Sequence, residues 1–308
     1  MMNPKTNAAN YTKNTPCVLH GKRLDAALAI LFPEFSRARL QTFIADSRVF
    51  LNGKAVLNQR QKIATGDWVF LNMDNLPTET LDAPENIPLN IVFEDEEILV
   101  INKEAGLTVH PGNGQKNGTL LNALLFYNAK LAQMPRAGIV HRLDKDTSGL
   151  MVVAKTLCAQ NDLVKQLKAK TVKRQYWALI HGQLPKNLKI EAPIGRHPKI
   201  RTKMAVIPNG KPATTEIFIL KKFAKTTLIE CHLQTGRTHQ IRVHLANYGF
   251  ALVGDPVYGK KNSAVSFHRQ ALHAKRLGLI HPKTRTELFW ETELPNDFEN
   301  LLKAQNNL

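Results

Sequence analysis

The amino-acid sequence predicts an α+β protein built from two domains, and three observations support this. The chain has 308 residues, which is long for one compact unit, although its 43% hydrophobic content can supply a core. Apolar residues recur with helical spacing in some segments and form strand-like runs in others. An acidic segment without either pattern divides the chain, so we place the two domains at residues 18–75 and 89–308.

Residues 1–17 are polar and have no hydrophobic periodicity, so we expect a disordered tail. They lack the charged-then-apolar pattern of a signal peptide, and no apolar run in the chain approaches the ~20 residues of a membrane span. We therefore expect a cytoplasmic protein. Cys17, Cys158 and Cys231 are scattered without metal-ligand spacing, which argues for reduced structural thiols and against a disulfide framework or a cysteine zinc site.

The domain at residues 18–75 is predicted to contain two helices followed by a hairpin. In RLDAALAILF the apolar residues share one helical face. Ser36 is predicted to cap the second helix, RARLQTFIAD. Asn52 and Gly53 separate two apolar runs in VFLNGKAV and predict a tight turn. The basic residues of this region are Arg37, Arg39, Arg48, Lys54, Arg60 and Lys62.

Residues 76–88 are predicted to be a linker, because their acidic and polar composition cannot bury enough apolar surface to fold. Beyond them, LNIVFEDEEILVINKEAG predicts two strands around an acidic turn. Further strand-like runs are GIV, GLMVVAKT, VKRQYWALIHG, ATTEIFIL and TTLIECHLQ. Helical stretches interleave with these strands, notably GTLLNALLFYNAKL and LCAQNDLVKQLKAK, which completes the α+β pattern.

The formal net charge of +17, with a pI near 9.9, indicates a polyanionic partner. Lysines and arginines that neutralise phosphates release counterions on binding, so such a surplus suits a nucleic acid. The positive charge lies in two blocks, because no Lys or Arg occurs between Lys62 and Lys103 while nine acidic residues do. A merely soluble basic protein is the alternative interpretation.

The most informative segment is GIVHRLDKDTSGLMVVAKT, in which charged and hydroxyl residues stand between two apolar runs. The polar cluster consists of His141, Arg142, Asp144, Lys145, Asp146, Thr147 and Ser148. An ordinary connection between strands needs only one or two turn residues, so packing alone explains this density poorly. A salt-bridged structural loop is the alternative to a functional site.

The segment HRLDKDTSGL resembles the active-site loop of the pseudouridine synthase family that includes the large-subunit ribosomal enzymes. Other blocks agree with the family in order and spacing: NKEAGLTVHPG, KRQYWALIHG, RHPKIRTKMAV, GKPATTEI, LQTGRTHQIRVHLA, LVGDPVYG and LHAKRLGLIHP. They cover nearly all of residues 89–290. The helix, helix, hairpin order at residues 18–75 is similar to the small RNA-binding domain named for ribosomal protein S-four.

The resemblance implies a catalytic fold with a largely antiparallel mixed sheet and flanking helices. It implies that Asp144 is the catalytic aspartate, that Tyr176 stacks on the target base and that Arg242 pairs with the aspartate. Arg142 resembles the residue that fills the gap left by the flipped base. The residues expected to contact RNA in the N-terminal domain are Arg37, Arg39, Arg48 and Lys54.

The reaction implied by the resemblance is the isomerisation of uridine to pseudouridine without a cofactor. The expected partner is large-subunit ribosomal RNA, free or in a precursor particle, and the protein is expected to be a monomer. Several sister enzymes share the site residues, so these residues do not choose the target uridines. We expect the choice to depend on other surfaces.

Two other interpretations of the residues remain, while a paired-carboxylate site and a metal site are not expected. Asp144 and Asp146 could pair as in a glycosidase, but side chains two apart on a loop need not converge, so Asp146 is given a structural role. A hydrolase could use Asp144 with His141, and a non-catalytic RNA-binding or ribosome-assembly protein would need neither. His239 and His244 lie five apart rather than the four of paired helical ligands, so no metal site is expected.

Overall fold

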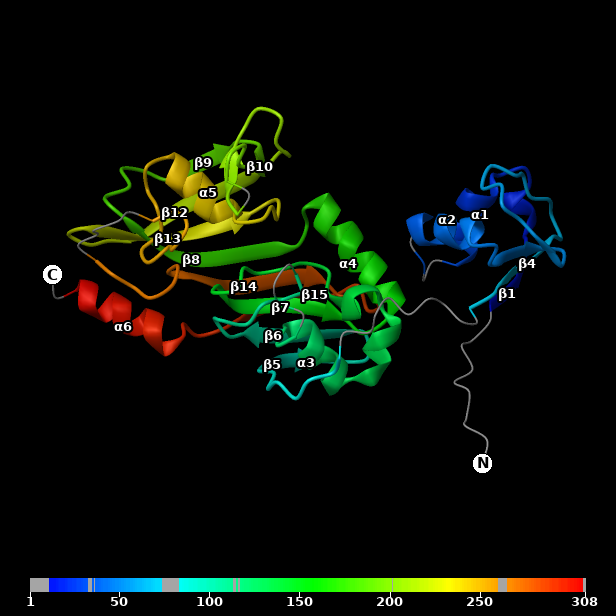
Figure 1. Cartoon of the computed structure of the whole chain (residues 1–308), viewed down its shortest axis with the longest axis horizontal. Helices are drawn as coiled ribbons and strands as arrows, with labels where there is room; N and C mark the ends of the chain where they lie inside the picture. The colour runs from blue at the N-terminus through cyan, green and yellow to red at the C-terminus, as the bar shows by residue number, and fades with distance from the viewer. Residues whose placement is uncertain are drawn as a thin grey trace. The chain divides into compact units, whose positions relative to one another are not determined.

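The computed structural model describes residues 11–32, 35, 37–73, 83–112, 115, 117–200, 202–259 and 265–306, except for the side chain of residue 38 (Figure 1). The chain divides between residues 81 and 82 into two compact units, and this division falls inside the segment predicted as a linker. Ser36, the predicted helix cap, lies outside the described residues, as do residues 1–10 of the predicted tail and 76–82 of the predicted linker.

The first unit combines two helices with a small antiparallel sheet. Helix α1 spans Leu24–Leu31 and α2 spans Arg37–Ala45, as the apolar spacing predicted. Among the described residues, four strands form a sheet in the order β1-β4-β2-β3. Its strands are β1 (Tyr11–Asn14), β2 (Val49–Leu51), β3 (Lys54–Ala55) and β4 (Trp68–Leu71). Asn52 and Gly53, both with positive φ, make the predicted turn between β2 and β3.

The prediction of a disordered tail extending to residue 17 is wrong from Tyr11 onward. Residues Tyr11–Asn14 form β1, which pairs antiparallel with β4, and Cys17–Leu19 form a 3-10 helix. The ring of Tyr11 meets those of Phe32 and Phe35 edge-on, at centroid distances of 6.3 and 5.4 Å. A four-residue strand with one aromatic anchor carries no detectable period, because its stability comes from pairing with a distant segment.

Asp25 joins the two helices of the first unit through a buried carboxylate. Its side chain has no solvent exposure, and it accepts hydrogen bonds from Arg23, Gln41 and Arg37, the last at 2.7 Å. Burial opposes ionisation, but the hydrogen bonds from Arg37, Gln41 and Arg23 lower the pKa of Asp25 to about 2. This contact ties α1 to the beginning of α2.

The second unit is built on a mixed sheet that contains nine strands within the described residues. The strand order is β5-β6-β7-β14-β8-β13-β12-β9, and β15 also pairs with β14. The strands are β5 (Ile91–Glu94), β6 (Ile98–Lys103), β7 (Ser148–Ala154), β8 (Lys173–His181), β9 (Leu188–Glu191), β12 (Thr214–Lys222), β13 (Thr226–Leu233), β14 (Leu272–Ile280) and β15 (Glu287–Glu291). The largely antiparallel mixed sheet expected from the resemblance is therefore confirmed.

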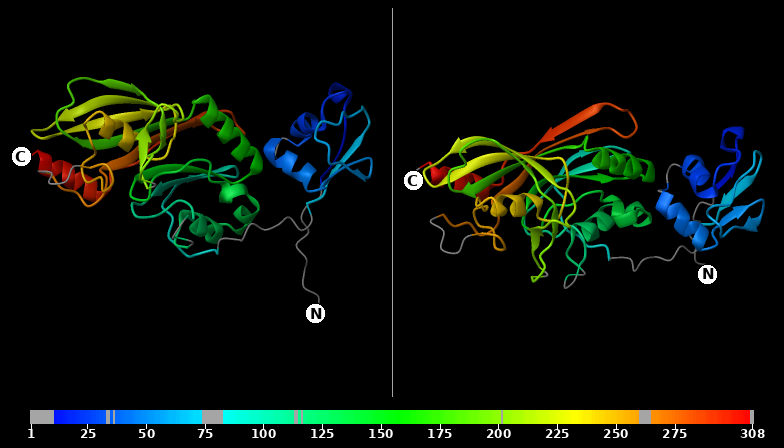
Figure 2. Two further views of the ribbon diagram at one scale, coloured as in Figure 1. Left: turned by 45° about the horizontal axis from the view of Figure 1, so that its top comes forward. Right: turned by 90° about the horizontal axis from the view of Figure 1, so that it is seen from above.

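Helices flank this sheet, with α3 and α4 near one end and α5 and α6 near the other (Figure 2). They span Leu120–Tyr127, Leu157–Ala169, Gln240–Asn247 and Asn296–Gln305, respectively. Short 3-10 helices cover Ala129–Gln133 and Pro135–Gly138, and β10 (Ile194–Arg196) and β11 (Met204–Val206) form a separate hairpin. Within the described residues, none of the helices has the length and apolar character needed to cross a membrane.

One parallel pairing interrupts the antiparallel sheet, between β7 and β14, where Ser148 and Gly149 lie opposite His273 and Ala274. The backbones approach closely here, since a Cβ on Gly149 would lie 2.3 Å from the carbonyl oxygen of Ala274. Gly149 also has a φ of +113°, a conformation that favours glycine. The glycine therefore allows β14 to lie directly behind the loop that precedes β7.

Two boundaries differ from the predictions. The run GIV before the polar loop makes only one isolated bridge, between Ile139 and Val153, instead of a strand. The second half of the predicted linker is attached to the second unit, because the Glu85 carboxylate accepts from the Gly118 amide at 2.9 Å and the carbonyl of Ala83 accepts from Asn122. The attachment of residues 83–88 depends on specific hydrogen bonds, which composition does not reveal.

Replacement of Asp25 by Asn is expected to destabilise the first unit by about 1–3 kcal/mol, because charge-assisted hydrogen bonds are lost from a buried site. Amide hydrogen exchange in residues 24–45 of the full chain should accelerate, and Asp46→Asn, on an exposed position, is the matched control. The depressed pKa means that the stabilisation is complete above the ordinary value of 3.8 and disappears as the pH falls through about 2. Unchanged exchange in Asp25→Asn would contradict this.

Candidate active site

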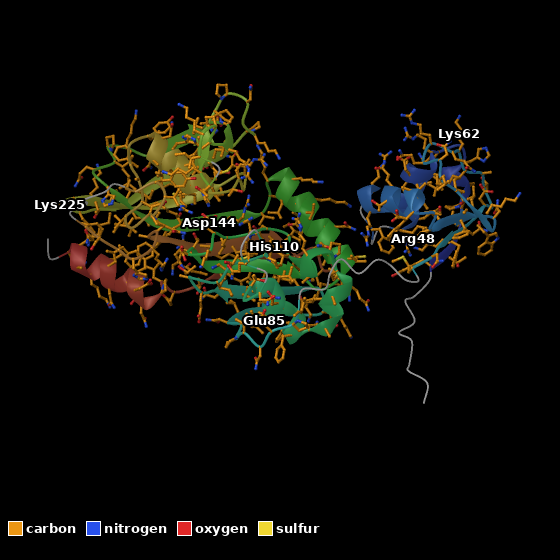
Figure 3. The ribbon with its side chains drawn as sticks, viewed as in Figure 1. Arg48, Lys62, Glu85, His110, Asp144 and Lys225 are labelled. Atoms are coloured by element: carbon orange, nitrogen blue, oxygen red, sulfur yellow. The ribbon has the colours of Figure 1, made fainter. Side chains whose placement is uncertain are left out.

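The polar loop of residues 141–147 leads directly into β7, and hydrogen bonds from two other segments, residues 103–106 and 269–270, hold it in place. Three successive carbonyls each accept at least one bond: Asp144 O from the Thr147 amide at 3.1 Å, Lys145 O from Gly106 at 3.0 Å and Lys103 at 2.8 Å, and Asp146 O from Arg269 at 3.1 Å. The side chain of Gln270 donates to Thr147 at 3.2 Å. These bonds give Asp144 a defined position over the middle of the sheet (Figure 3).

Lys103, at the end of β6, is a buried cation that holds this loop. Its ammonium group donates to the carbonyls of Glu104, Leu107 and Lys145 at 2.7, 2.9 and 2.8 Å. Burial lowers the pKa of Lys103 to about 7, and the charge of Asp146 acts in the opposite direction. Because a neutral amine has only two N–H groups, the three bonds require the protonated form. Sequence analysis gave this lysine no role.

Arg242, in the first turn of α5, bridges two carboxylates. Its Nη1 donates to Asp144 Oδ2 at 2.9 Å, and Nε and Nη2 donate to the two oxygens of Asp255 at 2.8 and 2.9 Å. The arginine side chain is 5% exposed and that of Asp255 is fully buried, whereas Asp144 keeps 15% exposure. Burial opposes the charge of Arg242, but the two carboxylates raise its pKa above the ordinary value. The site thus presents one partly accessible carboxylate.

Asp255 is a residue of the site that sequence analysis missed. Besides its bidentate contact with Arg242, its Oδ1 accepts from the amides of Val257 and Tyr258, both at 2.9 Å. Burial alone would raise the pKa of Asp255, but the hydrogen bonds and charge of Arg242 lower it. The sequence signal for Asp255 was the block LVGDPVYG, in which an acidic residue lies between glycines beside an apolar run. That pattern alone also fits a surface turn.

His239 and Tyr258 form the wall beside Asp144. His239 Nε2 lies 3.9 Å from Asp144 Oδ1, and its Nδ1 is 2.9 Å from the hydroxyl of Tyr258. That hydroxyl accepts from the Met204 amide at 2.8 Å, while the Tyr258 ring faces the guanidinium of Arg242 at 5.2 Å. Burial lowers the pKa of His239, and Asp144 acts in the opposite direction. The imidazole is therefore largely neutral at pH 7.

Tyr176 lies in β8, opposite Cys231 on β13 and Ala274 on β14. The residue is only 5% exposed, and it packs into the main hydrophobic core. Burial, together with the charge of Asp144, raises the pKa of Tyr176 to about 12, although Arg174 opposes this. The phenol therefore stays protonated at neutral pH, and what it can offer a substrate is an aromatic surface beside Asp144.

The structure separates the remaining sequence candidates into two groups. Arg142 is exposed in the same loop as Asp144, whereas the four N-terminal cations belong to the first unit. Arg37 contacts Asp25 but is still 53% exposed, and Arg39 lies 5.0 Å above the ring of Phe43. The remaining two are Arg48, which donates to Asn72 O at 3.4 Å, and Lys54, which is exposed on β3.

His141 is not arranged as a base for a hydrolase. Its Nε2 accepts a hydrogen bond from the Val152 amide at 3.1 Å, so that lone pair is occupied. Burial, with the charge of Arg174, lowers the pKa of His141 to about 3. Within the described residues, no group of three or more His, Cys, Asp or Glu side chains is placed to hold a metal ion.

Comparison with known proteins identifies the family to which this sheet and its aspartate loop belong. Residues 97–247 match the family model for RNA pseudouridylate synthases. The chain belongs to this family, and the protein is therefore an RNA pseudouridine synthase, an isomerase. Two solved human structures share the fold. The protein titled RNA Pseudouridylate Synthase Domain Containing 4 gives a TM-score of 0.56 at 26% identity, covering 70% of this chain and 93% of that one.

The second, RNA Pseudouridylate Synthase Domain Containing 1, gives a TM-score of 0.55 at 24% identity over 73% of this chain and 97% of that one. Among named relatives, the chain is 49% identical to ribosomal large subunit pseudouridine synthase D of Nitrosomonas europaea, covering 99% of this chain and 92% of the relative. It is 46% identical to the enzyme of the same name from Escherichia coli strain K12, covering 92% and 90%.

Asp144→Asn is expected to lower the rate of pseudouridine formation by at least roughly 10²–10⁴-fold, because the change is isosteric but removes the ionised carboxylate. Binding of RNA, measured by fluorescence anisotropy, should change little. Asp146→Asn is the control in the same loop and should lose much less activity, since Arg242 contacts Asp144 instead. Activity of Asp144→Asn close to that of the parent would rule out the assignment.

Asp255→Asn is expected to reduce kcat more than KM, because Arg242 loses the partner that fixes its orientation toward Asp144. Breaking one side of this buried pair should also lower stability by about 1–3 kcal/mol. Asp162→Asn makes the same chemical change at a surface pair with Arg285, and it should change neither kcat nor stability strongly. Equal kcat in Asp255→Asn and Asp162→Asn would show that Asp255 does not support the site.

Proposed function

We propose that the protein isomerises specific uridines of large-subunit ribosomal RNA to pseudouridine, with Asp144 as the catalytic carboxylate and without a cofactor. The observation that carries this proposal is the contact of Arg242 with Asp144. Arg242 binds Oδ2 of the carboxylate, and the side chain of Asp144 stays partly accessible. The family membership supplies the reaction class. The names of the relatives support the choice of RNA.

The reaction is an internal rearrangement that needs no redox partner. The bond between ribose C1′ and uracil N1 breaks, the base turns, and C1′ joins C5. The proton lost from C5 is balanced by the proton that N1 carries in the product. A carboxylate can assist as nucleophile or base, and the hydrogen bond from Arg242 orients that of Asp144. Tyr176 offers an aromatic surface that can hold the detached base while it turns.

The target uridine has to leave its stack before Asp144 can reach it, at a cost of a few kcal/mol. Arg142 is exposed on the loop that carries Asp144, and we assign it to the space that the extruded base vacates. An arginine suits this place because its planar guanidinium can stack on bases and bind phosphate. Its contribution would offset part of the unstacking energy.

We propose that the first unit is an RNA-binding domain similar to the one named for ribosomal protein S-four, joined to the catalytic domain near residue 81. Arg39, Arg48 and Lys54 are its candidate phosphate contacts. Arg37 has a structural partner in Asp25, so its exposed part would contact RNA while its inner nitrogens hold the two helices. Such contacts supply affinity and salt dependence without reading sequence.

Among the large-subunit enzymes, we favour the target of synthase D (D-type) over that of its sister enzyme, synthase C (C-type). Two observations support this choice: the names of the relatives and the amino-acid sequences of the blocks GTLLNALL, MPRAGIVHRLDKDTSGLMVVAKT and RHPKIRTKMAV. Both types share the site residues, so the choice rests on surfaces outside the site. We further propose that the enzyme acts as a monomer in the cytoplasm, on RNA that is free or in a ribosomal precursor particle.

Mapping pseudouridine in RNA from cells with and without the gene tests this proposal directly. Specific pseudouridines should disappear from large-subunit RNA and return when the gene is restored, but not with an Asp144→Asn gene. Unchanged pseudouridine in all RNA would contradict the proposed function. Losses confined to positions that C-type enzymes modify would overturn the D-type target and leave the enzyme class standing.

A further inference from the structure

Arg174 in β8 is a buried cation for which the described residues provide no countercharge. It is 7% exposed, its Nη2 makes one long hydrogen bond of 3.5 Å to Leu233 O, and its buried Nε has no hydrogen-bond partner. In the described part of the chain it forms no ion pair. An ionised group removed from water in this way is unfavourable unless a charge or several acceptors compensate it.

The other buried cations of the second unit are compensated. Arg242 contacts Asp144 and Asp255, and Arg269 contacts both oxygens of Asp297 at 2.7 and 2.9 Å. The remaining two are Lys275, which lies 3.2 Å from Glu291, and Lys103, whose three donors all meet carbonyl oxygens. The contrast indicates that the compensating group of Arg174 comes from outside the chain.

A hollow of about 390 Å³ lies between the end of α4 and the segment after β13, and its wall includes Gly236, a direct neighbour of Arg174. Its wall includes the cations Lys168, Lys170 and Arg237, and the described residues that line it include no acid. Gly236 is also part of the wall, and a Cβ there would lie 2.8 Å from Nη1 of Arg174. The guanidinium therefore lies directly behind a position that has no side chain to cover it.

The hollow adjoins the catalytic centre. Arg174 and Tyr176 alternate with outward residues on β8, so their side chains share one face about 6.8 Å apart along the strand. Val140, also in the wall, stands four residues before Asp144 and immediately precedes the rigid loop. A strand of RNA with its uridine at Asp144 would bring the neighbouring part of its backbone to this hollow.

We propose that Arg174, with Lys168, Lys170 and Arg237, binds a phosphodiester group of the RNA backbone next to the target uridine. A guanidinium matches two phosphate oxygens at once, and the surrounding lysines add charge without requiring a fixed geometry. The missing side chain at Gly236 allows the close approach. This subsite rests on the proposed function, since it supposes that the ligand is the RNA which Asp144 modifies.

The decisive variant is Arg174→Met, which removes the charge and keeps much of the apolar volume. The RNA-free variant should unfold at the same or a higher temperature than the parent, because an uncompensated buried charge is gone. KM for a stem-loop transcript of large-subunit RNA should rise at least tenfold, with a smaller change in kcat. The slope of log affinity against log salt should fall by about 0.7, the value for one lost contact with a single strand.

Lys173→Met is the matched control, since this neighbouring cation is exposed and pairs with Glu287 instead. It should leave KM and the salt slope as they are in the parent. A lower unfolding temperature of Arg174→Met with an unchanged KM and salt slope would overturn the subsite and make Arg174 a structural residue.

A second variant covers the case in which Arg174→Met does not fold. Lys168→Gln combined with Lys170→Gln changes only exposed positions and should lower the salt slope by about 1.4 for two lost contacts. An unchanged slope would overturn the subsite. If the parent protein modifies no RNA, the proposed function fails, and the affinities of parent and variants for the same transcript still decide whether the phosphate subsite exists.

Discussion

The catalytic geometry depends on the way in which one buried guanidinium is shared by two carboxylates. Asp255 binds Nε and Nη2 of Arg242 together, which fixes the plane of the guanidinium and leaves Nη1 for Asp144. Taking such ions out of water costs several kcal/mol for each, so the arrangement persists only because every charge has a partner. The result is an aspartate that is oriented and partly accessible.

The loop that carries Asp144 is rigid for a related reason. Its carbonyl groups point into the protein, where a buried lysine, a buried arginine and a glycine amide donate hydrogen bonds to them. The parallel contact between β7 and β14 brings Gln270 and His273 behind the same loop, where His273 lies 2.9 Å from Ser148. The bonds to the loop carbonyls restrict the loop to one conformation, which suits a site that must receive an extruded base.

Several of the basic residues that give the chain its net charge have structural contacts. Arg37 holds α1 to α2 through Asp25, Arg269 connects the loop to α6 through Asp297, and Arg242 is buried in the site. The number of lysines and arginines therefore overstates the number available to phosphates. Arg174 stands apart from these three, because the fold buries it and none of the acidic residues that the structure describes pairs with it.

The sequence by itself determined the local elements and the chemical types. Helical stretches predicted α1 and α4, strand-like runs predicted β8 and β13, and the dense polar loop predicted a functional site. These features are visible because a period or a cluster is a property of one continuous segment. The resemblance of several blocks then supplied the family and the pairing of Asp144 with Arg242.

Only the tertiary structure decided which distant groups meet. Strand β1 exists through its pairing with β4, and Asp255 joins the site because the chain returns to Arg242 after α5. Arg174 looked like an ordinary strand residue until its burial and its missing partner were known. A sequence pattern reports how one segment alternates between water and core, whereas the partner of a buried charge depends on packing between segments far apart in the chain.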